Sequence, residues 1–100
     1  MSAYVLVEIE VTDAATYERY KQLAEASVTA YGGRYVVRGG AVEVLEGERR
    51  PARLVLLEFP SVERAREWWA SPEYSAARPV RIASATAEMF LLPGYAPTAG

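Results

Sequence analysis

The stretch Ala3-Tyr-Val-Leu-Val-Glu-Ile-Glu-Val11 decides the fold of this 100-residue chain. Its β-branched residues recur at every second position, which is the period of a strand that buries one face. That face carries Val5, Val7, Ile9 and Val11. The other face is also largely apolar, because it carries Tyr4 and Leu6. The segment is therefore predicted to be a β-strand.

A helix is predicted next, over residues 14–31. Asp13 can cap its first turn, and Gly32-Gly33 is a natural stop after its last turn. Its apolar stripe has helical spacing and consists of Tyr17, Tyr20, Ala24, Val28 and Tyr31.

The rest of the chain contains three further strand patterns. They cover residues 34–38, 53–59 and 87–92. Between the first two of these, Gly39-Gly40 marks a turn or bulge, residues 42–46 are expected to return to extended structure, and residues 47–51 form a polar loop.

Two helix starts lie between the last two strands. Ser61 can cap a short helix that carries Trp68 and Trp69, and Ser71-Pro72 can start a further helix. Pro79 should bend or break this second helix, because proline lacks a backbone donor and its ring clashes with the preceding turn.

The resulting order, β-α-β-β-α-β, is typical of a ferredoxin-like α+β fold with a four-stranded antiparallel sheet. We expect the first and third strands to lie side by side and parallel at the centre of that sheet. Residues 1–94 are predicted to form a single domain, and residues 95–100 a flexible tail.

The helices can cover only one face of such a sheet. Alternation places on that face Val5, Val7, Ile9, Val55, Leu57, Phe59, Met89 and Leu91. The opposite face carries a second apolar set, Tyr4, Leu6, Leu54, Leu56, Phe90 and Leu92. A large open apolar face marks an interaction surface, so we predict a homodimer with two sheets packed face to face. The alternative is that a register slip or the C-terminal tail covers this face.

Composition argues against several function classes. The formal net charge is −2, and no basic cluster extends beyond Arg49-Arg50, so we expect no nucleic-acid partner. The N-terminal apolar run is far shorter than the roughly 20 residues of a membrane span, and it has no basic leader region. We therefore expect a cytoplasmic protein without a membrane partner.

The chain contains neither cysteine nor histidine. Their absence excludes disulfides, thiolate nucleophiles, zinc–sulfur sites, histidine-ligated haem and Ser-His-Asp triads. We predict no metal site and no cofactor. Any chemistry must use carboxylates, tyrosines, arginines, tryptophans or backbone groups.

Two carboxylates are the candidate catalytic groups. Glu8 and Glu58 have the parity of the second apolar face, and neighbouring central strands would bring them together. Two buried carboxylates cannot both ionise cheaply, so the pKa of one should rise unless a cation intervenes. Arg34 and Arg38 are candidate cations, and Arg38 is also a candidate catalytic anchor for an anion. The alternative is a structural ion-pair network between subunits.

Four aromatic side chains are candidate substrate-binding residues, namely Tyr17, Tyr20, Trp68 and Trp69. The two tyrosines are more simply explained as core residues of the first helix. Consecutive tryptophans point about 100° apart on a helix, so one faces the core and the other can line a pocket or an interface. Arg78 and Arg81, in the last helix, are more simply explained as part of a solvated face.

Several short motifs taken together resemble one known family. They are Gly32-Gly-Arg-Tyr35, Arg38-Gly-Gly40, Leu45-Glu-Gly47, Glu58-Phe-Pro-Ser61 and Ser71-Pro-Glu-Tyr74. Over residues 3–94 the chain resembles the family catalogued as domain of unknown function 1330. The resemblance implies membership of the dimeric α/β-barrel superfamily, which includes cofactor-free monooxygenases and muconolactone isomerase-like enzymes. Its haem-degrading and chlorite dismutase-like members depend on histidine. The family carries Trp-Tyr where this chain has Trp68-Trp69.

Two functions stay open from the sequence. The first is a cofactor-free enzyme, oxygenase-like or isomerase-like, that acts on a small organic molecule with Glu58 or Glu8 as base and Arg38 as anion anchor. The second is a non-catalytic dimeric module that binds a metabolite or supports another protein. A pocket with convergent polar groups would favour the enzyme, and a filled interior would favour the module.

Overall fold

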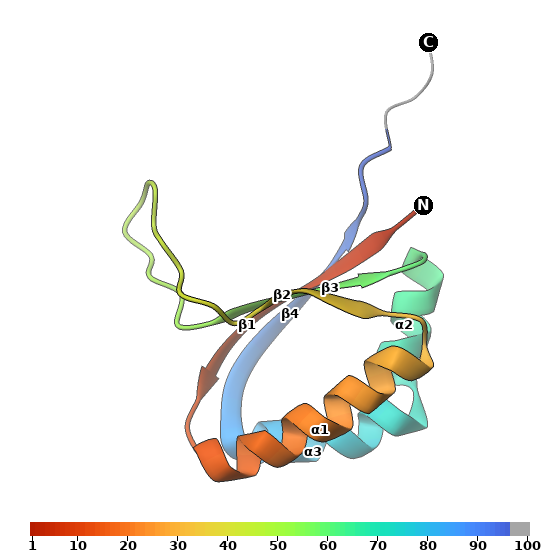
Figure 1. Ribbon diagram of the computed structural model, residues 1–100, viewed down its shortest axis with the longest axis horizontal. Helices are drawn as coiled ribbons and strands as arrows, with labels where there is room; N and C mark the ends of the chain where they lie inside the picture. Colours follow the sequence, from red (N-terminus) through yellow and green to blue (C-terminus); the bar gives the residue numbers. More distant parts are fainter. Residues whose placement is uncertain (97–100) are drawn as a thin grey trace.

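The computed structural model describes residues 1–96, which form four strands and three helices (Figure 1). In chain order these elements are β1 (Ala3–Val11), α1 (Ala14–Ala30), β2 (Arg34–Arg38), β3 (Leu54–Phe59), α2 (Val62–Ala70), α3 (Pro72–Ser84) and β4 (Ala85–Pro93). Most of the tail predicted at 95–100 lies outside the described residues. Pro93, which was assigned to the end of the domain, still pairs with Ala3 in the sheet.

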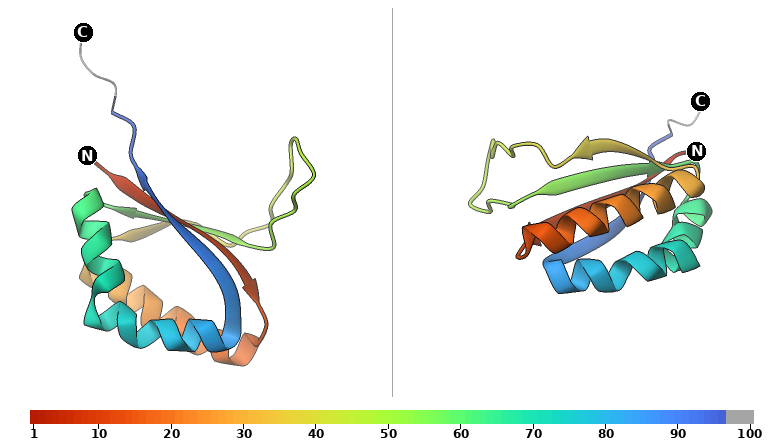
Figure 2. Two further views of the ribbon diagram at one scale, coloured as in Figure 1. Left: turned by 180° about the vertical axis from the view of Figure 1, so that it is seen from behind. Right: turned by 60° about the horizontal axis from the view of Figure 1, so that its bottom comes forward.

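The strands form one twisted sheet in the order β2-β3-β1-β4, and every neighbouring pair is antiparallel. All three helices lie on one side of this sheet, and the other side carries no helix (Figures 1 and 2). The ferredoxin-like α+β fold is therefore confirmed. Within one chain the sheet stays open and does not close into a barrel.

The predicted parallel arrangement of the first and third strands is wrong. β1 and β2 are joined through α1, and β3 lies between β1 and the edge strand β2. The chain reverses direction between β2 and β3, so β3 runs antiparallel to both of its neighbours. Tyr4 consequently lies opposite Glu58, and Glu8 lies opposite Leu54. This register changes the expected site, as described below.

Side-chain caps start the helices at the predicted residues. Asp13, Ser61 and Ser71 each accept a hydrogen bond from the backbone N–H three residues ahead, at 3.2, 3.0 and 3.1 Å. Each of these bonds satisfies a donor that the first helical turn leaves without a partner. Pro72 follows Ser71 directly, where its missing N–H has no cost.

The predicted break of the last helix at Pro79 does not occur, and the predicted extended segment at 42–46 is not a strand. α3 continues through Pro79 to Ser84, because a proline removes a single helical hydrogen bond while Ala77 and Ser84 on either side of it remain buried in the core. Residues 42–46 form no strand. Gly39 has a φ of 72°, a left-handed conformation that turns the chain out of the sheet before them. The segment from Gly39 to β3 projects away from the helices (Figure 1).

The helix-facing side of the sheet forms the core, as the alternation predicts. Of the residues assigned to this face, Val5, Val7, Ile9, Val55, Leu57 and Phe59 are buried, and Met89 packs against them. Trp68 and Tyr74 fill the space under the helices, with their ring centroids 4.4 Å apart. Leu91, assigned to the same face, remains partly exposed near the end of β4.

The opposite side of the sheet is the open apolar face that the sequence predicts. Tyr4, Leu6, Leu54 and Leu56 are only partly buried, and Phe90 and Leu92 are exposed. No helix within residues 1–96 covers it, and the strand register shows no slip that would bury it. From here on we call these six residues the open face.

Ser27 is expected to position Trp68 in the core. Its hydroxyl accepts a 3.0 Å hydrogen bond from Trp68 Nε1, and each residue is 1% exposed. Ser27→Ala leaves the buried indole N–H without a partner, so we expect the free energy of unfolding to fall by about 1–3 kcal/mol. Chemical denaturation measures this loss. Ser75→Ala, at an exposed position of α3, is the control and should stay within about 0.5 kcal/mol of wild type. Equal effects of the two substitutions would contradict this role.

Candidate functional site

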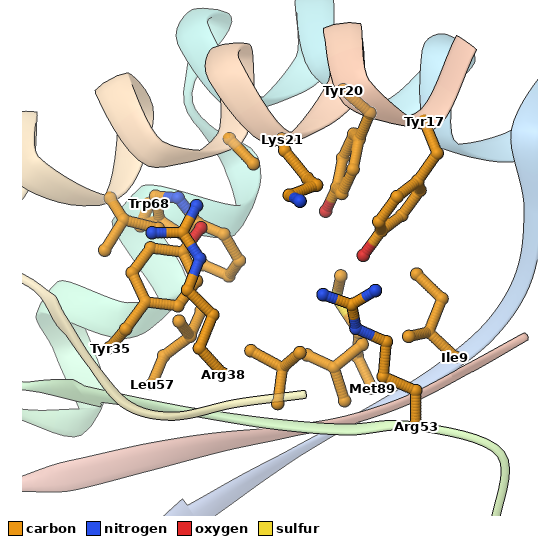
Figure 3. Close-up of a pocket in the computed structure, with 14 residues that line it drawn as sticks. Ile9, Tyr17, Tyr20, Lys21, Tyr35, Arg38, Arg53, Leu57, Trp68 and Met89 are labelled. Carbon is orange, nitrogen blue, oxygen red and sulfur yellow. The ribbon is translucent and has the colours of Figure 1, made fainter. Parts of the chain in front are cut away.

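A pocket lies between α1 and the helix-facing side of the sheet (Figure 3). Its apolar floor includes Val7, Ile9, Val55, Leu57 and Met89. Its polar lining consists of Tyr17, Tyr20 and Lys21 from α1, Tyr35 and Arg38 from β2, and Arg53 just before β3. The enclosed space is about 30 Å³, enough for one or two water molecules.

α1 supplies the phenols of the pocket. Tyr17, Tyr20 and Lys21 lie three and four positions apart on one helix face, and their polar ends point toward the sheet (Figure 3). The two tyrosines are 5% and 7% exposed. Burial raises the pKa of both phenols, and it raises the pKa of Tyr35 on β2 to about 12. All three hydroxyls therefore stay protonated at neutral pH and can donate hydrogen bonds.

A β-bulge brings Arg38 into the pocket. The register of β2 on β3 shifts between Tyr35 and Val37, so Arg38 lies opposite Val55 of the inner face. Its guanidinium pairs with Glu25 at 2.9 Å and lies 4.2 Å from the Tyr35 ring centroid. The hydrogen bond to Glu25 raises the pKa of Arg38, which keeps this group charged. Arg38 thus forms part of the outer wall of the pocket.

Arg53 enters the pocket from the residue before β3. Its position has the parity of Val55, so its side chain reaches the helix-facing side and lies 5.5 Å from the Tyr17 ring centroid. Gly39 makes room for it, because a Cβ at Gly39 would collide with the Arg53 guanidinium. The Nε atom of Arg53 is buried and has no hydrogen-bond partner. A buried donor without a partner is costly and rare in folded proteins.

The pocket carries an excess of positive charge. Lys21 pairs with Glu18 at 3.1 Å, and Arg38 pairs with Glu25 at 2.9 Å. Arg53 has no ion pair within the described part of the chain. An apolar floor weakens solvent screening of this remaining charge. The charge of the pocket therefore favours an anionic group over a cationic one.

The predicted carboxylate pair does not form. Glu8 and Glu58 share the open side of the sheet, but the residue opposite Glu58 on β1 lies four positions from Glu8, or about 13 Å along the strand. Arg34 pairs with Glu58 at 2.6 Å, and Arg49 pairs with Glu8. Hydrogen bonds from Ser2 and Arg34 lower the pKa of Glu58, so this carboxylate is ionised rather than protonated. Of the two candidate counter-ions, only Arg34 reaches Glu58.

The two tryptophan side chains point to different sides of α2, as their consecutive positions predict. Trp68 is 1% exposed and lines the pocket, whereas Trp69 is 50% exposed and lies under the Arg78 guanidinium, 4.2 Å from it. Trp69 lines a different groove of about 440 Å³ between α2 and β4, together with Phe90 and Leu91. The structure brings Tyr17, Tyr20, Trp68 and Arg38 to one pocket and leaves Trp69 outside it. Their roles in binding stay predictions.

Three polar residues of the pocket were not among the sequence candidates, namely Lys21, Tyr35 and Arg53. Arg53 carried a usable signal, because it is an arginine with the parity of the buried side of its strand. Lys21 lies four positions after Tyr17 on the inner edge of the helix stripe. On the open side, the neighbour of Glu8 is Glu88, which only the observed pairing of β1 with β4 reveals.

Residues 1–96 contain neither a candidate metal site nor a candidate membrane span. No three acidic side chains gather in a way that could hold a metal ion. None of the helices in this range has the length and apolar character needed to cross a membrane.

The fold and the pocket define a ferredoxin-like α+β protein with a cationic, tyrosine-lined cavity between sheet and helices. The chain belongs to the family described as Domain of unknown function (DUF1330), whose model matches residues 2–95. This membership confirms the resemblance seen in the sequence motifs. Among curated proteins, none matches the chain.

Several solved structures share the fold at low sequence identity. The RPA0582 protein of unknown function from Rhodopseudomonas palustris is 20% identical with a TM-score of 0.77, over 96% of this chain and 84% of that one. SnoaB, a cofactor-independent oxygenase from Streptomyces nogalater, is 15% identical with a TM-score of 0.68, over 96% and 95%. A dimeric ferredoxin-like protein of unknown function from Jannaschia sp. CCS1 is 17% identical with a TM-score of 0.64, over 94% and 100%.

Arg53 should reduce the stability of the ligand-free protein. Arg53→Met keeps an apolar stem in the same space and removes the buried Nε without a partner, so we expect the free energy of unfolding to rise by about 1 kcal/mol. Arg38→Met is the matched control, because its guanidinium has an ion pair and its loss should bring no gain. Urea denaturation compares the two variants. A larger loss for Arg53→Met than for Arg38→Met would show that Arg53 is a structural residue.

Proposed function

We propose that this protein binds a small organic anion in the pocket between α1 and the sheet, and acts on it without a cofactor as an oxygenase or an isomerase. The observation that carries the proposal is Arg53, whose Nε is buried without a partner and whose side chain lines the same pocket as Tyr17, Tyr20 and Tyr35. A buried polar group of this kind is explained when a ligand completes its hydrogen bonds.

The pocket chemistry supports an anion with a phenolic or enolic oxygen. A nearby positive charge favours the ionised form of an acid, so Arg53 lowers the pKa of a bound phenol or enol. Tyr17 and Tyr20 add hydrogen-bond donors for the same oxygen. A stabilised phenolate or enolate is electron-rich enough to react with oxygen or to be reprotonated at another carbon. Both cofactor-free reactions therefore begin from the species that this pocket favours.

A ligand must displace the outer wall to enter, because the enclosed space is only about 30 Å³. The Lys21 and Arg38 side chains are 30% and 39% exposed, and each is held by one carboxylate at the surface. Long side chains of this kind can move outward without disturbing the core. Tyr17, Tyr20 and Arg53 would then contact the ligand.

The fold that this chain shares with SnoaB is compatible with a cofactor-independent oxygenase, although it establishes the fold alone. Glu8 and Glu58 lie on the other side of the sheet from the pocket. The proposal therefore places them in an ion-pair network at a subunit interface and assigns the anion to Arg53 and Arg38. A non-catalytic binding module would use the same pocket. Oxygen uptake, or deuterium incorporation from heavy water into an enolisable acid, would distinguish the enzyme from the module.

A coloured phenol tests the binding proposal directly. 4-Nitrophenol absorbs visible light only as its anion, so titration reports both its affinity and the pKa of the bound phenol. We expect the pKa to fall on binding, and Arg53→Met to weaken binding about tenfold, the loss expected for one charge-assisted hydrogen bond. Arg66→Met, at an exposed position of α2, removes the same charge outside the pocket and should bind like wild type. Equal binding by Arg53→Met and wild type would refute the proposal.

The proposal includes a homodimer that buries the open face. A second copy supplies the same apolar surface, and two sheets packed face to face would form the dimeric α/β barrel that the family resemblance implies. The dimeric protein from Jannaschia sp. CCS1 has the same fold, which supports this assembly. The ion pairs Arg34–Glu58 and Arg49–Glu8 flank the apolar centre of the face.

A charge at the centre of the open face should prevent this assembly. Leu56 lies opposite Leu6 on that face, so Leu56→Lys places a charge where the partner sheet would pack. We expect light scattering after gel filtration to give two chains for wild type and one for Leu56→Lys. Leu23→Lys is the matched control, because Leu23 is exposed on α1, away from the sheet. A dimeric Leu56→Lys protein would show that the open face is not the interface.

A further inference from the structure

Behind the pocket, a chain of hydrogen bonds connects Tyr20 to an arginine that does not line it. Tyr20 Oη lies 3.0 Å from Tyr74 Oη, and Arg81 Nη1 donates a 2.8 Å hydrogen bond to the same Tyr74 oxygen. Tyr74 is 0% exposed and Tyr20 is 7% exposed, so this chain is closed to solvent at both phenols. Neither Tyr74 nor Arg81 lines the pocket.

The donors and acceptors along this chain have a preferred order. A guanidinium can only donate, so the Tyr74 oxygen must accept from Arg81. Tyr74 then has one proton to give, and its possible acceptors are Tyr20 Oη at 3.0 Å and Met89 Sδ at 3.8 Å. A phenol oxygen is a much better acceptor than a thioether sulfur. This difference favours an order in which Tyr74 donates to Tyr20.

In this order, neither Tyr74 nor Arg81 accepts the hydroxyl proton of Tyr20. The Tyr20 hydroxyl faces the pocket (Figure 3), where the enclosed space of about 30 Å³ has room for a water molecule as acceptor. Arg81 makes no ion pair with a carboxylate within residues 1–96, so no carboxylate in this range neutralises its charge.

We propose that Arg81 and Tyr74 are positioning residues that orient Tyr20 as a hydrogen-bond donor into the pocket, which selects ligands that present an acceptor oxygen there. Arg81 occupies an acceptor site on Tyr74, Tyr74 donates to Tyr20, and Tyr20 can then only donate to the ligand. A ligand group that can only donate would meet no acceptor at this point. The inference rests on the proposed anion-binding function and narrows its ligand to phenolates, enolates and carboxylates.

Burial keeps the Tyr20 hydroxyl protonated, as a donor into the pocket requires. It raises the pKa of Tyr20, so the phenol keeps its proton across the range in which the protein would work. The charge of Arg81 also polarises the Tyr74 hydroxyl, and hydrogen bonds in a chain strengthen one another. Tyr20 is therefore a better donor than an isolated buried tyrosine.

A double-mutant cycle with 4-nitrophenol as the probe tests the inference. Tyr20→Phe removes the donor, and Arg81→Met frees the Tyr74 oxygen so that Tyr20 can turn its proton away from the pocket. Each change should weaken binding of the anion roughly tenfold. In the Tyr20→Phe background, Arg81→Met should have no further effect, because the group that it orients is already gone. Arg81→Lys, which can still donate to Tyr74, should bind close to wild type.

Equal weakening by Arg81→Met in both backgrounds would overturn the inference, because Arg81 would then act through its charge or through stability alone. A failure of Arg81→Lys to restore binding would overturn it as well. If wild-type protein does not bind 4-nitrophenol in the pocket, the proposed function fails, and the orientation of Tyr20 is then judged without ligand.

Nuclear magnetic resonance provides that ligand-free measurement. The Tyr74 hydroxyl proton should appear as a slowly exchanging resonance with contacts to the Tyr20 ring, because it is buried and bonded. It should persist in Arg81→Lys and disappear in Arg81→Met. Three results would each overturn the proposed order of donors from Arg81 through Tyr74 to Tyr20. The Tyr74 resonance could be absent from wild type, it could persist in Arg81→Met, or the slowly exchanging proton could belong to Tyr20.

Discussion

The structure depends on the pairing of β1 with strands on both of its sides. β3 and β4 bind β1 in fixed antiparallel register, so every second residue of the central strand faces the helices. A shift by one residue would move Val5, Val7 and Ile9 to the open side. The same register gives the sheet two apolar sides with helices available for only one, and it determines which charged residues share a surface.

The pocket arises where this regular pairing ends. β2 loses its register on β3 at the bulge before Val37, and Gly39 turns the chain out of the sheet one residue after Arg38. The edge of the sheet thereby brings Arg38 and Arg53 under α1, whose inner stripe supplies tyrosines. Because the strand edge is irregular beside a regular helix, long arginine side chains can reach the pocket. A regularly packed core would have no room for such charged groups.

Predictions from the sequence were most accurate for features that depend only on residues close together in the chain. Strand alternation and helix caps need only neighbouring residues, so the buried and open sides of the sheet and the starts of the helices were predicted correctly. The pairing of Glu8 with Glu58 required the relative direction of two distant strands, and the assumed direction was wrong. The place of Arg38 depended on a bulge that leaves no pattern in the sequence. Arg53 could have been found, because its parity already assigned it to the helix side.

The pairing of β1 with β4 also affects how the chain folds as it is made. Ala3 lies beside Pro93, so the central strand of the sheet gains one of its two neighbours only after some ninety residues have been synthesised. Contacts this far apart in sequence slow folding and leave hydrophobic strands exposed in the meantime. During translation, β1 can pair with β3 before β4 exists, so the edge of β1 that β4 will cover stays unpaired until the end of the domain has been made.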